Sequence, residues 1–270
     1  MKINRGPAVR PPRTVIHGGA GVGKTTFACS APSPIMIPVE DGASQVGVDR
    51  FDLVRKSAEV EQHLESLLAD EHDYQTVIID SLDWYERLLH EEHAASMGVP
   101  AISEIPYGRG YSAMVPRWER LRRLLDRCRD ERGMAIVLIA HTEVKHQEPP
   151  DSDPYDASVL KLHKSAASII TEWADVVGFA SLETRVKETD TGFGRKSARG
   201  VSTGKRILRL HPSPAYTAKT RYPMPEKIAL SWDAFVDAFV ASQDKLDIKA
   251  SISKIKSQSE SENSSNQEVK

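Results

Sequence analysis

Short apolar runs alternate with amphipathic stretches over most of the chain. The runs are rich in β-branched residues and predict strands at residues 14–17, 35–39, 51–54, 76–80 and 134–140. A 3.6-residue apolar period predicts helices between them, from the glycine-rich segment to residue 28 and at 59–68, 84–97 and 116–132. Strands that alternate with helices predict a parallel sheet with helices on both faces.

The rhythm changes in the second half of the chain. Residues 176–186 and 206–211 are predicted strands, and a connection rich in Gly, Lys and Arg joins them. Two neighbouring strands without an intervening helix favour an antiparallel pairing. The predicted fold is therefore α/β: a mostly parallel central sheet, helices on both faces and an antiparallel C-terminal extension.

Composition divides the chain into three parts. Residues 1–12 form a basic arm, and residues 13–242 carry the alternating pattern of a folded core. Residues 249–270 contain seven serines and no aromatic residue. Such a segment buries too little apolar surface to offset its ordering entropy, so 243–270 is predicted to be a disordered Ser-rich tail.

Charge and cysteine content exclude several classes of protein. Lys and Arg number 36 against 38 Asp and Glu, so the net charge alone predicts no affinity for nucleic acid or membrane. Two cysteines cannot form a disulfide framework. The longest apolar run, 134–140, is far too short to span a bilayer. We therefore expect a cytoplasmic protein without a membrane partner.

The strongest motif follows the first predicted strand. Residues 18–25, GGAGVGKT, match G-x-x-x-x-G-K-[ST] at every fixed position and precede a predicted helix. Glycines let successive backbone N–H groups point at phosphate oxygens, and the helix N-terminus favours the same anion. Lys24 is expected to reach the β- and γ-phosphates of ATP. The predicted ATP-binding residues are Gly18, Gly19, Ala20, Gly21, Val22, Gly23, Lys24, Thr25 and Thr26.

Two residues are predicted to hold Mg²⁺. The hydroxyl of Thr25 belongs to the motif, and Asp80 ends the apolar strand 76–80. Hydroxyl and carboxylate oxygens in these positions hold the metal that accompanies the nucleotide. The alternative for Asp80 is that it only caps the next helix.

Hydrolysis also needs a group that activates water. Many P-loop ATPases place a Glu directly after the strand-end Asp, but this chain has Ser81 there. Glu40 follows the apolar strand 35–39, and the carboxyl ends of parallel strands line the ligand crevice. Glu40 is therefore the predicted base, with Asp41, Asp83 and Glu86 as alternatives.

His141 follows the strand 134–140 at the same predicted edge of the sheet. A polar side chain there can hydrogen-bond the γ-phosphate or its attacking water, and it can pass the nucleotide state to the following loop. The alternative is a histidine bonded to a nearby carbonyl group.

With these residues in place, the chain resembles the RecA-type recombinase core, in particular the phage-encoded RecA-like ATP-binding proteins that act in single-strand annealing. The resemblance covers roughly residues 14–230. It rests on GGAGVGKTT (18–26), VED (39–41), TVIIDS (76–81), VLIAHTEV (137–144), TEWADVVGFA (171–180) and AKTRY (218–222).

The resemblance implies roles for several residues. Glu40 matches the water-activating Glu of the family, and His141 stands where a Gln is common. Lys219 and Arg221 stand where groups from a neighbouring subunit reach the γ-phosphate, which implies a homo-oligomer, ring or filament, with ATP at the subunit interface. Two loops, about 98–115 and 145–164, would bind single-stranded DNA. A single-strand-binding protein is a further possible partner, and a phage protein would act in the host cytoplasm.

The residues themselves support DNA binding in part. Eight Lys or Arg and no acid lie between residues 191 and 222: Arg195, Lys196, Arg199, Lys205, Arg206, Arg209, Lys219 and Arg221. Such a stretch can follow a phosphate backbone, or it can be a solvated hairpin. In the first loop, Tyr107, Arg109 and Tyr111 suit stacking on unpaired bases. The middle of the second loop is acidic, which disfavours phosphate.

The leading hypothesis is an ATPase, stimulated by DNA, that binds single-stranded DNA and promotes annealing or homologous recombination. A P-loop switch that acts on a protein partner, such as a loader or packaging accessory, is the alternative. A small-molecule kinase is less favoured, because no compact lid with clustered arginines is evident over the P-loop, although the stretch 195–209 could mimic one.

Overall fold

The computed structural model describes residues 10–42, 46–150, 153–190 and 196–243, without the side chains of 185–202. The predicted arm up to residue 9 and the predicted tail beyond residue 243 lie outside these ranges. None of the helices within these ranges is both long and apolar enough to cross a membrane.

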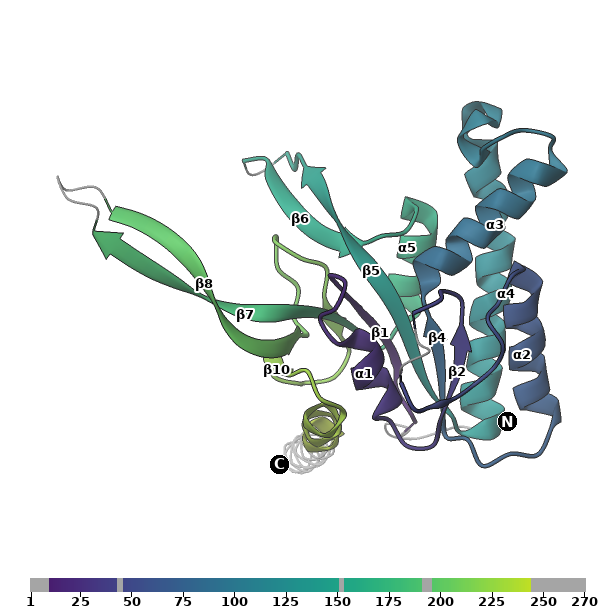
Figure 1. Cartoon of the computed structure of the whole chain (residues 1–270), viewed down its shortest axis with the longest axis horizontal. Helices are drawn as coiled ribbons and strands as arrows, with labels where there is room; N and C mark the ends of the chain where they lie inside the picture. Colours follow the sequence, from purple (N-terminus) through teal and green to yellow (C-terminus); the bar gives the residue numbers. More distant parts are fainter. Residues whose placement is uncertain (1–9, 43–45, 151–152, 191–195, 244–270) are drawn as a thin grey trace, which may run out of the picture.

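Ten strands of the described ranges form one mixed sheet (Figure 1). They are β1 (Arg13–Gly18), β2 (Pro34–Pro38), β3 (Asp49–Arg50), β4 (Thr76–Asp80), β5 (Ala135–Gln147), β6 (Tyr155–Leu160), β7 (Val176–Asp190), β8 (Lys196–Arg209), β9 (Lys219–Thr220) and β10 (Lys227–Ala229). Their spatial order is β10-β8-β7-β1-β5-β4-β2-β3, with β6 beside β5 and β9 beside β7. The strands from β7 to β3 in this order run parallel.

Helices cover both faces of this sheet. They are α1 (Lys24–Cys29), α2 (Ser57–Ala69), α3 (Leu82–Ser96), α4 (Arg109–Arg132), α5 (Lys164–Trp173) and the helical residues 232–243. Alternate residues of the central strands enter two separate cores, as buried parallel strands require. On β1, Val15 packs into the core under α2 to α5, and Ile16 packs into the core under α1 and Phe235. The predicted fold class is confirmed.

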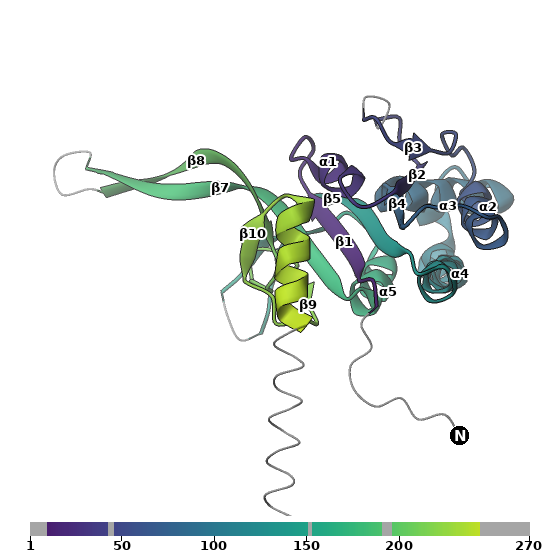
Figure 2. The same cartoon turned by 90° about the horizontal axis from the view of Figure 1, so that it is seen from below.

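The antiparallel extension is also confirmed, and it is longer than predicted. Strand β7 pairs with β1 in parallel and then continues beyond the sheet as a two-stranded arm with β8 (Figures 1 and 2). The connection predicted between residues 186 and 206 is thus largely strand. Strand β10 adds to β8 in antiparallel pairing.

Three local predictions are wrong. Residues 51–54 are not a strand: β3 has only two residues, and the segment after it bonds to β2 only through the Phe51 and Val54 amides. The loop predicted at 98–115 contains two short 3-10 turns, η2 (Ile102–Glu104) and η3 (Pro106–Gly108), and the start of α4. The loop predicted at 145–164 is mostly the hairpin of β5 with β6.

Tertiary packing explains why α4 begins seven residues before its predicted start. A side chain on Gly110 would come within 2.6 Å of Ile102 and 2.9 Å of Ile105, so the glycine lets the first turn pack closely against η2. This contact and buried Met114 hold the turns before Pro116 in helical form. Proline removes one backbone donor, but burial of this apolar face offsets that loss.

A buried charge cluster joins the starts of β1 and β7 to α4. Arg13 donates to both carboxylate oxygens of Asp175, at 3.0 and 2.8 Å, and Arg129 and Arg221 lie 3.6 and 3.2 Å from the same carboxylate. Burial opposes the charge of Asp175, but its hydrogen bonds with Arg13 outweigh burial and keep the pKa of Asp175 below its usual range. The carboxylate is therefore the shared anion of three arginines.

We predict that Asp175→Ala lowers the free energy of unfolding by about 3–5 kcal/mol, because it leaves three arginines without their buried anion. Urea unfolding of the purified protein measures this change. The matched control, Asp130→Ala, removes an exposed partner of Arg10 and should cost at most about 1 kcal/mol. Equal midpoints for the two variants would contradict the structural role of the cluster.

Candidate active site

The motif at residues 18–25 forms the turn between β1 and α1. Gly21 and Gly23 have φ of +72° and +104°, which side chains rarely adopt, and Gly23 caps the helix that begins at Lys24. A side chain on Gly18 would lie 2.4 Å from the carbonyl oxygen of Ala180, so β7 also requires glycine there. The predicted phosphate loop is thus present between a strand and a helix N-terminus.

Lys24 lies at the centre of this loop. Its Nζ donates to the carbonyl oxygens of Gly18 and Gly19, both at 3.0 Å. Burial lowers the pKa of Lys24, and the nearby carboxylates of Asp80 and Glu40 oppose that shift. The loop therefore holds one buried ammonium group on two backbone carbonyl oxygens, beside the N-terminus of α1, and a cation in such a loop can bind a phosphate chain.

Thr25 and Asp80 meet as predicted. The Thr25 hydroxyl donates to Oδ2 of Asp80 at 2.7 Å. The other carboxylate oxygen, Oδ1, is buried without a hydrogen-bond partner among the described residues, and burial raises the pKa of Asp80. A hard cation such as Mg²⁺ would take its ligands from this pair of oxygen donors and neutralise the buried charge, so the residues fit the metal.

Glu40 lies beside this pair because of the sheet register. Pro38 pairs with Asp80 across β2 and β4, and the Glu40 amide donates to the Asp80 carbonyl oxygen at 3.2 Å. The Glu40 carboxylate accepts a long hydrogen bond of 3.4 Å from Ser81 and lies 3.9 Å from Nδ1 of His141. Burial, followed by the charge of Asp80, raises the pKa of Glu40, which makes the carboxylate a stronger base.

His141 is held by Asp83. The His141 amide donates to Asp83 at 3.0 Å, and its Nδ1 lies 3.0 Å from the other carboxylate oxygen. This hydrogen bond raises the pKa of His141. Burial opposes ionisation of Asp83, but the bonds from His141 outweigh it and lower the pKa of Asp83. Asp83 therefore fixes the orientation of the His141 ring.

Sequence reasoning missed one residue of this cleft. The cleft has a volume of about 370 Å³, and Arg206 of β8 lines it. The Arg206 guanidinium lies beside Gly23: a Cβ on Gly23 would be 3.1 Å from one of its nitrogens. In the sequence Arg206 belongs to a basic stretch that suits either a phosphate backbone or a solvated hairpin, and only the β7–β8 pairing brings it to the phosphate loop.

The other candidates for the water-activating base lie in different surroundings. Asp41 is exposed, and Asp83 is occupied by His141. Glu86 lines a separate cavity and is absent from the cleft that holds Glu40 and Asp80. Glu40 remains the candidate base.

Lys219 and Arg221 lie toward the amino ends of the parallel strands, whereas the phosphate loop lies at their carboxyl ends. Lys219 pairs with Val177 in β7, about 10 Å along the strand direction from Ala180, the partner of Gly18. Its amine donates to the Thr171 and Glu172 carbonyl oxygens at the end of α5, at 2.7 and 2.9 Å. Arg221 also donates to the carbonyl oxygen of Glu172. Neither side chain lines the cleft of its own subunit.

The residues predicted to contact DNA do not form one surface. Of the basic set, Arg195, Lys196 and Arg199 have side chains outside the described residues, and Arg206 faces the cleft while Lys219 faces the far edge. In the first predicted loop Tyr107 is 94% exposed with Arg109 over its ring. Tyr111 instead stacks on His163.

We predict that Asp83→Asn lowers the pKa of the His141 imidazole, because the variant removes the negative charge that favours the protonated ring. Titration of the His141 ring by NMR measures the shift. Asp156→Asn, which makes the same change 3.0 Å from His146, is the control and should leave His141 unchanged. If His141 titrates identically in Asp83→Asn and the unchanged protein, Asp83 does not set its ionisation.

Comparison with known proteins identifies the family to which the chain belongs. No curated protein matches the chain. A solved structure described as the crystal structure of the RadB recombinase is similar at 13% identity and a TM-score of 0.42, and the match covers 74% of this chain and 80% of that one. The model of a family described as an AAA domain matches residues 10–222, which include the phosphate loop, Glu40, Asp80 and His141. The chain therefore belongs to this AAA domain family.

Proposed function

We propose that the protein binds and hydrolyses ATP with Mg²⁺, binds single-stranded DNA, and promotes annealing or homologous recombination. The observation that carries the ATPase part is the meeting of Lys24, Thr25, Glu40, Asp80 and His141 in one cleft. Acids, a cation and a histidine from four separate segments converge there on a loop shaped for phosphate. Sites of this composition are typical of phosphoryl transfer to water.

The roles of the residues follow from their surroundings. The loop amides and Lys24 bind the phosphate chain, and Thr25 and Asp80 would hold Mg²⁺, which neutralises phosphate charge when it is bound. Glu40 accepts the proton of the attacking water, since its raised pKa strengthens it as a base. His141, oriented by Asp83, donates a hydrogen bond to the water or the terminal phosphate. Arg206 adds a positive charge at the mouth of the loop.

We predict that Glu40→Gln retains ATP binding and loses about 100-fold or more of its turnover, because an amide cannot accept the proton of water. Steady-state ADP release and equilibrium binding of a fluorescent ATP analogue separate the two effects. Asp41→Asn is the matched control, since it makes the same change at an exposed neighbour. Unchanged turnover in Glu40→Gln removes Glu40 from the mechanism.

A homo-oligomer is part of the proposal. Lys219 and Arg221 lie away from their own phosphate loop, where they bond to Glu172, so in this proposal they would reach the nucleotide of a neighbouring subunit. A ring or filament in which this edge meets the next cleft would place ATP between subunits. ATP binding would then control assembly on DNA. A setting in a phage-infected cell, with a single-strand-binding protein as a further partner, belongs to the same proposal.

The DNA part is tested by turnover. At low salt, oligo(dT) is expected to increase ATP hydrolysis, and added salt should reduce the stimulation because phosphate contacts release counterions. The control is turnover without DNA. If the protein neither binds DNA nor is stimulated by it, this part of the proposal is contradicted, and a switch that acts on a protein partner is favoured. ADP release only with an added phosphoryl acceptor would favour a small-molecule kinase.

A further inference from the structure

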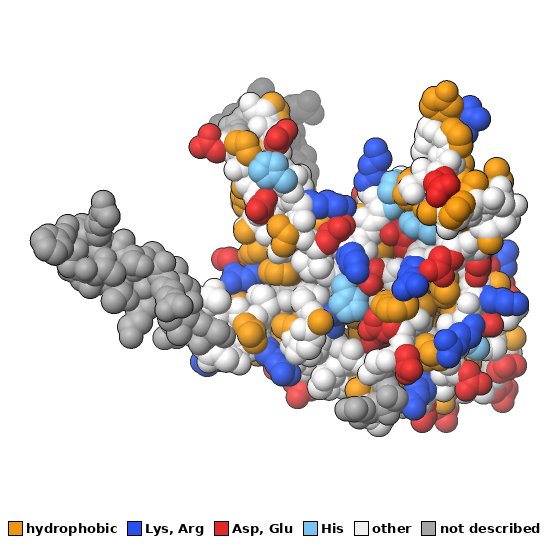
Figure 3. All heavy atoms as spheres, turned by 45° about the horizontal axis from the view of Figure 1, so that its top comes forward, with side chains coloured by type: hydrophobic (Ala, Val, Ile, Leu, Met, Phe, Trp, Pro, Cys, Tyr) orange, Lys and Arg blue, Asp and Glu red, His pale blue; other side chains and the backbone are white. Residues whose placement is uncertain are grey.

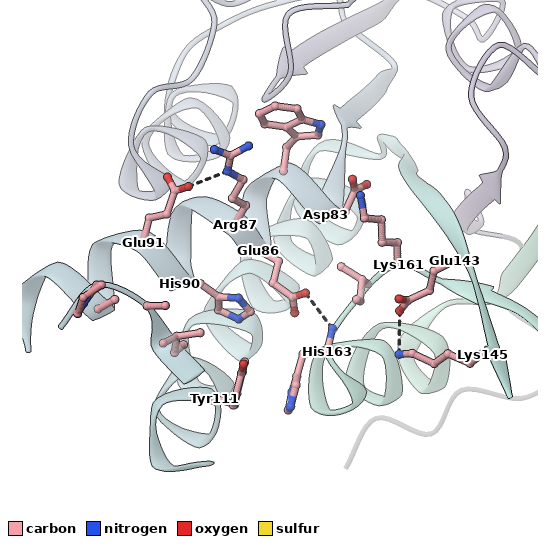
Figure 4. A pocket seen from close by; sticks show the side chains of 16 residues that line it. Asp83, Glu86, Arg87, His90, Glu91, Tyr111, Glu143, Lys145, Lys161 and His163 are labelled. Carbon is pink, nitrogen blue, oxygen red and sulfur yellow. Dashed lines mark hydrogen bonds and ion pairs between the residues drawn. The ribbon is translucent and has the colours of Figure 1, made fainter. Parts of the chain in front are cut away.

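A second cavity lies next to the active site, on the other side of Asp83. It has a volume of about 630 Å³, within the usual range for small-ligand sites, and it lies between α3, the start of α4 and the β5–β6 hairpin (Figure 4). Figure 3 shows a hollow between this hairpin and the tip of the helices, bordered by Lys, Arg and His side chains. This cavity is separate from the ATP cleft, because the two share no lining residue.

Planar rings form part of its wall. Tyr111 stacks on His163 with ring centres 4.2 Å apart, and His90 meets the edge of Tyr111 at 5.3 Å. Burial lowers the pKa of His90 to about 4 and also lowers that of His163, so burial favours the uncharged form of both rings. Trp84, 37% exposed, also lines the cavity, with the Arg87 guanidinium over its ring. Uncharged aromatic surfaces of this kind stack on nucleobases.

Glu86 gives the cavity a buried acceptor. One of its oxygens accepts from the His163 amide at 2.8 Å, while the other, Oε1, is buried without a partner in the described part of the chain. Figure 4 shows the carboxylate pointing toward His163, near His90 and Tyr111. Burial raises the pKa of Glu86 to about 7. A ligand that donates a hydrogen bond would give Oε1 the partner that it lacks and offset the cost of the unpaired oxygen.

The rim of the cavity carries three cations and two carboxylates. Arg87 forms an exposed ion pair with Glu91, Lys145 forms a half-buried pair with Glu143, and Lys161 is exposed. An exposed pair contributes little to stability, so a phosphate group can replace Glu91 beside Arg87 at small cost. Rings, a buried acceptor and cations on the rim match the parts of one nucleotide.

We propose that this cavity binds one unpaired nucleotide of single-stranded DNA and favours bases that carry an exocyclic amine. A carboxylate accepts a hydrogen bond from the amine of cytosine or adenine. Thymine presents carbonyl oxygens on both sides of its only ring N–H and meets the carboxylate unfavourably. The inference rests on the proposed DNA function. It also supplies a route to stimulation, because Asp83 lines the cavity and binds His141 of the ATP cleft.

The test compares oligo(dC) with oligo(dT) of equal length, by fluorescence anisotropy under mildly alkaline conditions. The unchanged protein should bind oligo(dC) about tenfold more tightly, the size expected of one good base contact. Glu86→Gln should abolish this preference, because the amide accepts from His163 and turns its NH₂ toward the base. Glu131→Gln, about 30 Å along α4 from Tyr111, is the matched control and should keep the preference.

A second variant does not depend on the buried site. Lys161→Gln changes an exposed rim residue, so folding should be unaffected, and it should weaken both oligonucleotides equally and reduce the salt dependence. Equal binding of the two oligonucleotides by the unchanged protein, or a preference that survives in Glu86→Gln, overturns the inference while DNA binding stands. If free deoxycytidine monophosphate binds to the protein and neither oligonucleotide does, both the assignment of the cavity to DNA and the proposed DNA function are overturned.

Discussion

The parallel register of four central strands is the constraint on which the active site depends. Gly18 pairs with His141, Asp80 pairs with Pro38, and β4 and β5 are neighbours in the sheet. These residues are far apart in sequence, yet the carboxyl ends of their strands meet at one edge. A shift of one residue in any of these strands would turn its side chains to the other face, so the two buried cores that fix the register also fix the chemistry.

One short segment connects the chemistry to the neighbouring cavity. Asp80 ends β4, Asp83 lies in the first turn of α3, and Glu86 follows one turn later. The three carboxylates serve different purposes because their neighbours differ. Thr25 donates to Asp80, the His141 ring bonds to Asp83, and the His163 amide donates to Glu86. Only the Asp83 side chain therefore separates the cavity from His141, the histidine of the ATP cleft.

The opposite edge of the sheet is organised by charge. Asp175 gathers arginines from β1, α4 and the segment after β9, while Lys219 caps the end of α5. These contacts hold Lys219 and Arg221 in fixed positions on the outer edge. Fixed cations on an edge suit contact with a second subunit better than mobile ones, because less side-chain entropy is lost on binding.

The sequence alone was sufficient for the fold class, the phosphate loop, and the meeting of Asp80 with Thr25, because motif spacing and strand ends are local signals. It also pointed correctly to the carboxyl edge as the place of Glu40 and His141. Only the tertiary structure decided the pairing of Asp83 with His141, the position of Arg206 in the cleft, and the early start of α4 at Gly110. Each of these depends on contacts between segments distant in the chain, and neither hydrophobic period nor local propensity carries information about such contacts.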